Sequence, residues 1–164
     1  MCIYEIYTDG SAIGQTPNYY GGWGMVILKN GKKITDFSDS KFPSTNNEME
    51  LTAILNAIEH IENIYEFGTT YIIYTDSNYS LQCVTNWCKK WINNGWINSK
   101  KEPVANKEII EKIYLKLLAM PYIEIRKVKG HSNNEWNNYA DELARKASAL
   151  KKKQILEGEE DNGK

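Results

Sequence analysis

The sequence predicts an α/β domain in which a mixed five-stranded sheet is flanked by helices. Three strand patterns follow one another closely at the start of the chain, and Asn30-Gly31 between two apolar runs indicates a tight antiparallel turn. Two further strand patterns alternate with helical segments, which is typical of strands added in parallel to a sheet. At 164 residues the chain is long enough for one domain with its own core.

The first predicted strand covers residues 2–8, which are rich in β-branched and aromatic side chains. We expect this strand to end at Asp9, because Gly10 and Ser11 favour a turn. Asp before Gly is an ordinary turn signal, so this position alone does not identify a site. The return strand of the hairpin is predicted over residues 32–42 and completes an antiparallel meander.

The first long helix is predicted over residues 46–63. Thr45 and Glu48 have the spacing of a capping box, in which both side chains bind free N–H groups of the first turn. The apolar side chains recur on one face, and Glu50 lies at the top of that face. A carboxylate directed toward a core is unfavourable without a partner. Glu50 is therefore a candidate site residue, whereas Glu48 has a local explanation.

A buried strand is predicted over residues 69–75, because this run is short, apolar and β-branched. Asp76 follows it and precedes a helix over residues 77–87, which the same carboxylate could also cap. Both Asp9 and Asp76 come directly after Tyr-Thr at the end of a strand pattern. If the two strands are neighbours, these carboxylates lie together at one edge of the sheet.

A segment rich in tryptophan and lysine covers residues 87–103. Trp87 and Trp91 are four residues apart, so they could pack on one helix face as part of the core. Lys89 and Lys90 between them indicate a second possibility, a basic arm that meets phosphate groups. The two explanations are compatible, since the indoles could hold the base of such an arm.

In the last part of the chain, the spacing of apolar residues predicts a helix over residues 106–120, a strand over 122–128 and a final helix from Trp136 onward. With the elements above, these segments make up a catalytic domain of residues 1–150. Residues 151–164 are highly charged, and we expect them to form a disordered tail.

Two polar residues in this part are further candidates. Asp141 borders the apolar stripe of the final helix, and an ion pair with Arg145, four residues later, is the alternative explanation. His131 lies in a polar loop that contains glycine, where a histidine without a function would simply be solvated.

The composition indicates in which cellular compartment the protein works and which partners it can bind. The three cysteines have neither a disulfide nor a zinc pattern, and no segment resembles a signal peptide or a membrane span. We therefore expect a cytoplasmic monomer without membrane contact. The net charge is −1, but residues 87–129 carry ten Lys and Arg against four Glu, so a basic face for nucleic acid is compatible with it.

The predicted fold brings four carboxylates toward one place, those of Asp9, Glu50, Asp76 and Asp141. Carboxylates close together in apolar surroundings raise one another's pKa, and a divalent cation removes that conflict. Oxygen ligands without His or Cys select Mg²⁺ or Mn²⁺ over zinc. Four carboxylates can bridge two such ions, an arrangement suited to in-line displacement at phosphorus.

Six motifs resemble those of type 1 ribonuclease H, in its free-standing bacterial form: YTDGS, TNNEMELTA, YTDSNYS, the tryptophan-lysine segment, VKGHSNN and ADELARKA. The resemblance covers residues 3–150 and implies a ribonuclease H-like fold. It implies endonucleolytic cleavage of the RNA strand of RNA-DNA hybrids, leaving 3′-hydroxyl and 5′-phosphate ends. By motif, the four carboxylates are implied as ligands of two Mg²⁺ ions in the substrate complex. His131 is implied to assist proton transfer or product departure.

The resemblance also implies contacts with the hybrid. Recognition of the RNA 2′-hydroxyl is implied for the backbone of Gly10 and Ser11 and for the amides of Asn46, Asn47 and Asn78. Contacts with the DNA strand are implied for Thr45, Trp87, Lys89, Lys90 and Trp91. Asn137, one turn before Asp141, is implied to orient that carboxylate. Helix-start chemistry alone would also account for Asn46 and Asn47.

Three other functions are compatible with parts of this pattern. Another nuclease of the same fold usually lacks the two amides in TNNEMEL. A catalytically inactive hybrid-binding module would be favoured by the loss of a carboxylate, and all four are present. A detached reverse-transcriptase domain is the third alternative.

Overall fold

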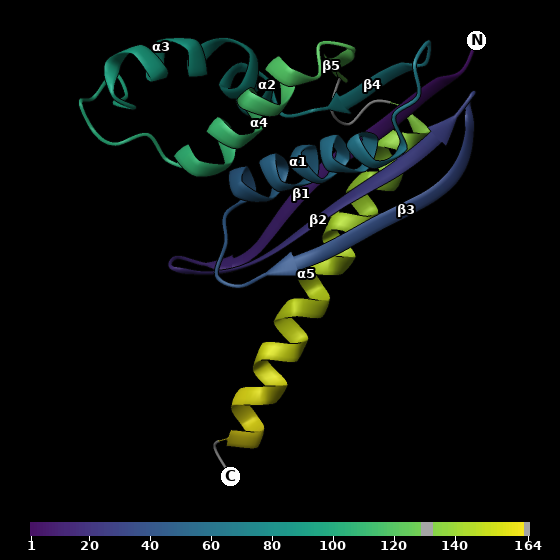
Figure 1. Ribbon diagram of the computed structural model, residues 1–164. Coiled ribbons are helices and arrows are strands. Elements are labelled where there is room, and N and C mark those ends of the chain that lie inside the picture. Colours follow the sequence, from purple (N-terminus) through teal and green to yellow (C-terminus); the bar gives the residue numbers. More distant parts are fainter. Residues whose placement is uncertain (129–132, 163–164) are drawn as a thin grey trace.

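The structure, a computed structural model, describes residues 1–128 and 133–162. Five strands form one mixed sheet in the order β3-β2-β1-β4-β5 (Figure 1). They are β1 (Ile3–Gln15), β2 (Asn18–Lys29), β3 (Lys32–Lys41), β4 (Thr70–Thr75) and β5 (Ile123–Lys127). The β1-β2 and β2-β3 pairs are antiparallel, whereas β1-β4 and β4-β5 are parallel. The predicted fold class is confirmed.

Helices cover both faces of the sheet. They are α1 (Asn46–Ile64), α2 (Asn78–Gln82), the π-helical turn η1 (Cys83–Trp87), α3 (Cys88–Asn94), α4 (Lys107–Ala119) and α5 (Glu135–Asn162). Because successive residues of a strand point to opposite faces, Ile6 of β1 joins the core under α1, while Tyr7 joins the core under α5. Among the described residues, none of the helices is both long enough and apolar enough to cross a membrane.

Strand β1 does not end at Asp9 as expected. It continues to Gln15, and Asp9 pairs with Gly24 of β2 in the middle of the antiparallel ladder. The long neighbour β2 supplies partners that a local turn signal cannot reveal. The parallel pairing of β1 with β4 does stop close by, at Tyr7 opposite Tyr74. Asp9 therefore lies where β4 leaves the sheet, rather than where β1 ends.

At the start of α1, one of the two hydrogen bonds of the expected capping box is present, the one accepted by Thr45. Thr45 is the N-cap, and its Oγ1 accepts a hydrogen bond of 3.1 Å from the backbone N–H of Glu48. The Glu48 carboxylate instead accepts a hydrogen bond from Ser44 Oγ at 3.0 Å and forms an ion pair with Lys41 at 2.6 Å. The buried face of the helix includes Glu50, as predicted.

The expected disorder of the tail is wrong for residues 151–162, because α5 continues to Asn162. These residues are mostly strong helix formers such as Lys, Gln, Leu and Glu. The C-terminal half of α5, yellow in Figure 1, extends past the sheet, and Leu150 is consequently 55% exposed. The division of the chain at residue 150 stays a prediction.

Candidate active site

Three of the four predicted carboxylates meet at the centre of the sheet. Asp9 comes from β1, Asp76 follows β4, and Glu50 comes from α1, which packs on β1. One carboxylate oxygen of each residue lies within 4.8 Å of the others. Two neighbouring parallel strands and the helix above them therefore bring together side chains that are far apart in the sequence.

The lack of a side chain at Gly10 allows Glu50 to lie close to Asp9. A Cβ atom at Gly10 would lie 2.3 Å from the backbone nitrogen of Glu50, far inside van der Waals contact. The backbone of α1 thus rests directly on β1, one residue after Asp9. The Gly10 N–H also donates a hydrogen bond of 2.9 Å to Asp9 Oδ1, which helps to orient this carboxylate.

The site concentrates buried negative charge. Asp9 and Glu50 are 4% and 5% exposed, and Oε2 of Glu50 is buried without a hydrogen-bond partner among the described residues. Burial raises the pKa of Asp9 to about 7; a hydrogen bond with Glu50 opposes this shift, and the charge of Asp76 adds to it. Burial, with Asp9 and Asp76 nearby, also raises the pKa of Glu50 well above its usual value.

This arrangement fits a divalent cation. The three side chains offer oxygen ligands, and a cation would both compensate their charges and supply a partner for the buried Glu50 oxygen. A capping role does not explain Asp76, because Ser77 is the N-cap of α2 and its Oγ accepts a hydrogen bond of 3.1 Å from Ser80 N–H.

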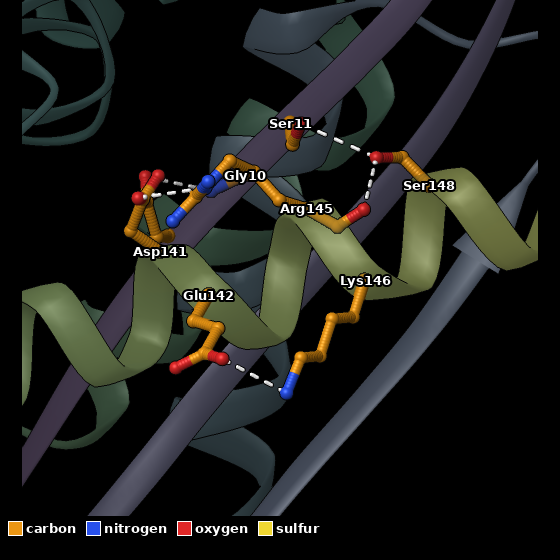
Figure 2. A network of polar contacts seen from close by, with 8 residues as sticks. Gly10, Ser11, Asp141, Glu142, Arg145, Lys146 and Ser148 are labelled. Atoms are coloured by element: carbon orange, nitrogen blue, oxygen red, sulfur yellow. Dashed lines mark hydrogen bonds and ion pairs between the residues drawn. The ribbon is translucent and has the colours of Figure 1, made fainter.

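Asp141 lies beside this group but outside it. Its Oδ2 accepts a hydrogen bond of 2.9 Å from Arg145 Nε, so the ion pair considered from the sequence is present. Figure 2 shows Asp141 directed from α5 toward Gly10 of β1. It is close enough to raise the pKa of Asp9, although burial of Asp9 contributes most to that shift.

Several predicted substrate contacts are at exposed positions: Thr45, Asn46, Asn47, Asn78, Lys89 and Lys90. Ser11 is partly exposed, whereas Asn137 is buried near Asp141 and is 3% exposed. His131 lies outside the described residues.

Of the two tryptophans, one packs against the core and the other is exposed enough to contact a nucleic acid. Trp91 packs against the main core, while Trp87 is 38% exposed, with 6.0 Å between their ring centroids. Both line a groove of about 340 Å³ together with Lys90. An aromatic groove with a lysine at its edge suits a nucleic-acid strand.

The structure adds a feature that the sequence did not indicate. A cleft of about 810 Å³ separates β3 from the starts of α1 and α4, and its lining includes Trp23, Lys41, Asn106 and Lys107. Lys107 also lies over the Trp96 ring, 5.9 Å from its centroid. These residues are widely spaced in the chain, so no local pattern marks the cleft.

A sheet of this topology with carboxylates at its centre defines the class of metal-dependent nucleases with the ribonuclease H-like fold. The RNase H family model matches residues 3–149. A ribonuclease H from Geotalea uraniireducens is 39% identical over 143 residues, which cover 87% of this chain and 92% of the relative. The chain belongs to the ribonuclease H family, and hydrolysis of the RNA strand of RNA-DNA hybrids is the activity of that family.

Solved structures agree with this assignment. The foamy viral protease-reverse transcriptase in complex with an RNA/DNA hybrid matches with a TM-score of 0.77 and 27% identity, over 88% of this chain and 20% of that protein. LC9-RNase H1, a type 1 RNase H with the type 2 active-site motif, matches with a TM-score of 0.73 and 25% identity, over 91% of this chain and 73% of that protein.

Proposed function

We propose that this ribonuclease H cleaves its substrate with two divalent cations, Mg²⁺ or Mn²⁺, held by Asp9, Glu50, Asp76 and Asp141. The observation that carries the proposal is the buried Oε2 of Glu50, which lies next to Asp9 and has no hydrogen-bond partner in the part of the chain that the structure describes. When bound, such ions supply an activated water molecule and neutralise charge on the leaving oxygen. The protein's own part is to hold Asp9, Glu50 and Asp76 close together, with Asp141 beside them, where the phosphate must lie.

The substrate of the proposal is an RNA-DNA hybrid. A relative of the same fold binds an RNA/DNA hybrid, which supports this choice. Asn46, Asn47 and Asn78 are exposed and come from the helices that follow β3 and β4. Their amides can donate to and accept from a 2′-hydroxyl, and so distinguish RNA from DNA. Backbone groups of Gly10 and Ser11 lie beside Asp9 and are assigned the same role.

Contacts with the DNA strand are assigned to Thr45 and to the residues Trp87, Lys89, Lys90 and Trp91 of the tryptophan-lysine segment. Exposed lysines meet phosphates, and the indoles offer surfaces for sugars or bases. Asn137 is assigned the role of orienting Asp141. His131 is assigned a role in proton transfer or product departure. The protein is assigned to the cytoplasm, which agrees with its three free cysteines, and is assigned as a monomer.

The test uses four end-labelled duplexes with Mg²⁺: RNA-DNA hybrid, double-stranded RNA, double-stranded DNA, and DNA with one ribonucleotide. We expect cleavage of the RNA strand of the hybrid alone, and only with metal. Asp9→Asn should lower this rate by about 10³-fold while hybrid binding persists, because several kcal/mol of transition-state stabilisation is lost. Binding of the hybrid by the unmodified protein without any cleavage in Mg²⁺ or Mn²⁺ would support the inactive binding module instead.

A further inference from the structure

Among the described residues, Asp141 is the only one of the four carboxylates that forms an ion pair. Asp9, Glu50 and Asp76 form the described group whose oxygens lie within 4.8 Å, and Asp141 is not a member. Its Oδ2 is 2.9 Å from Arg145 Nε, four residues later on α5. A carboxylate bonded to a guanidinium is already neutralised, so it has less to gain from a cation.

Helix α5 itself is held firmly against the sheet at this level. A Cβ atom at Gly24, the residue opposite Asp9, would lie 2.5 Å from Leu143 Cβ, and one at Gly22 would lie 2.3 Å from Ala144 O. The buried Ser148 hydroxyl donates to Arg145 O and lies 3.3 Å from Ser11 Oγ of β1 (Figure 2). Because the helix is seated so closely, a change of partner at Asp141 would use rotation of its side chain and not movement of α5.

We propose that Arg145 is a positioning residue that competes with the divalent cation for the carboxylate of Asp141. In the metal-free protein Arg145 binds Oδ2 of this carboxylate, which lies beside Asp9 but outside the group of Asp9, Glu50 and Asp76. Release of Asp141 from Arg145 accompanies uptake of the ion that Asp141 binds. This inference rests on the proposed metal-binding role of Asp141.

The competition makes uptake of the ions sequential. Asp9, Glu50 and Asp76 are already close together, so they can hold an ion without breaking any described ion pair. Binding that uses Asp141 Oδ2 competes with its bond to Arg145. Arg145 also places a positive charge near the incoming cation, and both effects weaken binding in the same direction.

The neighbouring pair on α5 provides a matched control. Glu142 and Lys146 have the same spacing of four residues and the same N–O distance of 2.9 Å. Both pairs are partly or largely exposed to solvent. Figure 2 shows Glu142 and Lys146 on another side of the helix, directed away from Gly10. Lys146→Ala therefore removes one positive charge and one ion pair without releasing Asp141.

The experiment is calorimetric titration of Mn²⁺ into the metal-free protein without substrate. Arg145→Ala should bind Mn²⁺ about two- to fivefold more tightly than the unmodified protein, the range expected for loss of one exposed ion pair. Lys146→Ala should not change the affinity. Asp141→Asn should weaken binding, and adding Arg145→Ala to Asp141→Asn should have no further effect.

Weaker binding in Arg145→Ala would overturn the inference, because it would show that Arg145 helps Asp141 to reach the metal. Equal affinity in Arg145→Ala and the unmodified protein would also overturn it. Absence of Mn²⁺ binding by the unmodified protein would instead contradict the proposed metal site as a whole. These results are distinguishable in one set of titrations, and circular dichroism of each variant shows whether it is folded.

Discussion

Gly10 lies so close to Glu50 that a Cβ atom at position 10 would be 2.3 Å from the Glu50 backbone nitrogen. This contact lets α1 rest on β1 directly after Asp9, and it thereby sets the distance between two of the buried carboxylates. A backbone contact, and not a side-chain interaction, is therefore what assembles this part of the site.

Replacing Gly10 with alanine tests this relationship. We expect Gly10→Ala to lower the free energy of unfolding by about 1 to 3 kcal/mol, because the methyl group forces α1 away from β1. It should also weaken Mn²⁺ binding, since Glu50 moves with the helix. Urea denaturation and calorimetry measure the two effects.

Gly158→Ala is the control for this substitution. Gly158 lies in α5 and an added Cβ would meet nothing within 4 Å, so stability should stay unchanged or rise by about 0.5 kcal/mol. Unchanged stability and unchanged Mn²⁺ affinity in Gly10→Ala would show that α1 can shift without cost and that the contact does not set the site.

The raised pKa of Asp9 predicts how stability depends on pH. The carboxyl has a pKa of about 7 in the folded protein against a usual value of 3.8, so the folded state holds its proton more tightly. The resulting stabilisation is fully present below about pH 4 and is lost as the pH rises through 7. For the metal-free protein, Asp9 alone should lower the free energy of unfolding by about 2 to 3 kcal/mol between pH 5 and 8.

Asp9→Asn isolates this contribution, because an amide does not titrate. Urea denaturation in a chelating buffer at pH 5 and pH 8 gives the difference in stability between the variant and the unmodified protein. We expect Asp9→Asn to gain relative stability at pH 8. The same difference at both pH values would mean that Asp9 is not destabilised by its charge.

The basic side chains next to the tryptophans should control hybrid affinity. Replacing Lys89 and Lys90 together with alanine should weaken binding and reduce the slope of log K against log salt by up to about one unit per lost phosphate contact. Both side chains are exposed, so the fold should be unaffected. Filter binding of the hybrid with Mg²⁺ omitted, between about 50 and 200 mM salt, provides the measurement.

Lys152 and Lys153 are the matched pair for this test. They are also exposed and belong to the C-terminal half of α5, the segment that extends past the sheet (Figure 1). Their replacement should leave the salt slope nearly unchanged. If both double variants gave the same slope, Lys89 and Lys90 would contribute only general charge.

The sequence predicts the parts of the site that depend on local patterns. Asp9 and Asp76 each follow Tyr-Thr, and the structure pairs Tyr7 with Tyr74 on neighbouring parallel strands. Glu50 stands on the apolar face of its helix, and that face is buried. Periodicity and repeated strand endings are enough for these residues, because each signal lies within a few positions of the residue concerned.

Other features depend on contacts between distant segments. Strand β1 continues beyond Asp9 because β2 pairs with it as far as Gln15. The local sequence of β1 does not indicate this pairing. Whether Asp141 faces the other carboxylates or Arg145 depends on a side-chain conformation, and both partners are available to it. The cleft beside Lys41 and Asn106 is lined by residues of β2, β3, α1 and α4, so it forms only when the chain is folded.

The central claim is that the buried carboxylates bind divalent cations, and Glu50 is the residue that tests it most directly. Calorimetric titration of Mn²⁺ should show saturable binding to the unmodified protein. Binding to Glu50→Gln should be at least about tenfold weaker, because the amide keeps the shape but removes the charge. Equal affinity in the two proteins would contradict the account, since the buried Glu50 oxygen would then have no part in holding a cation.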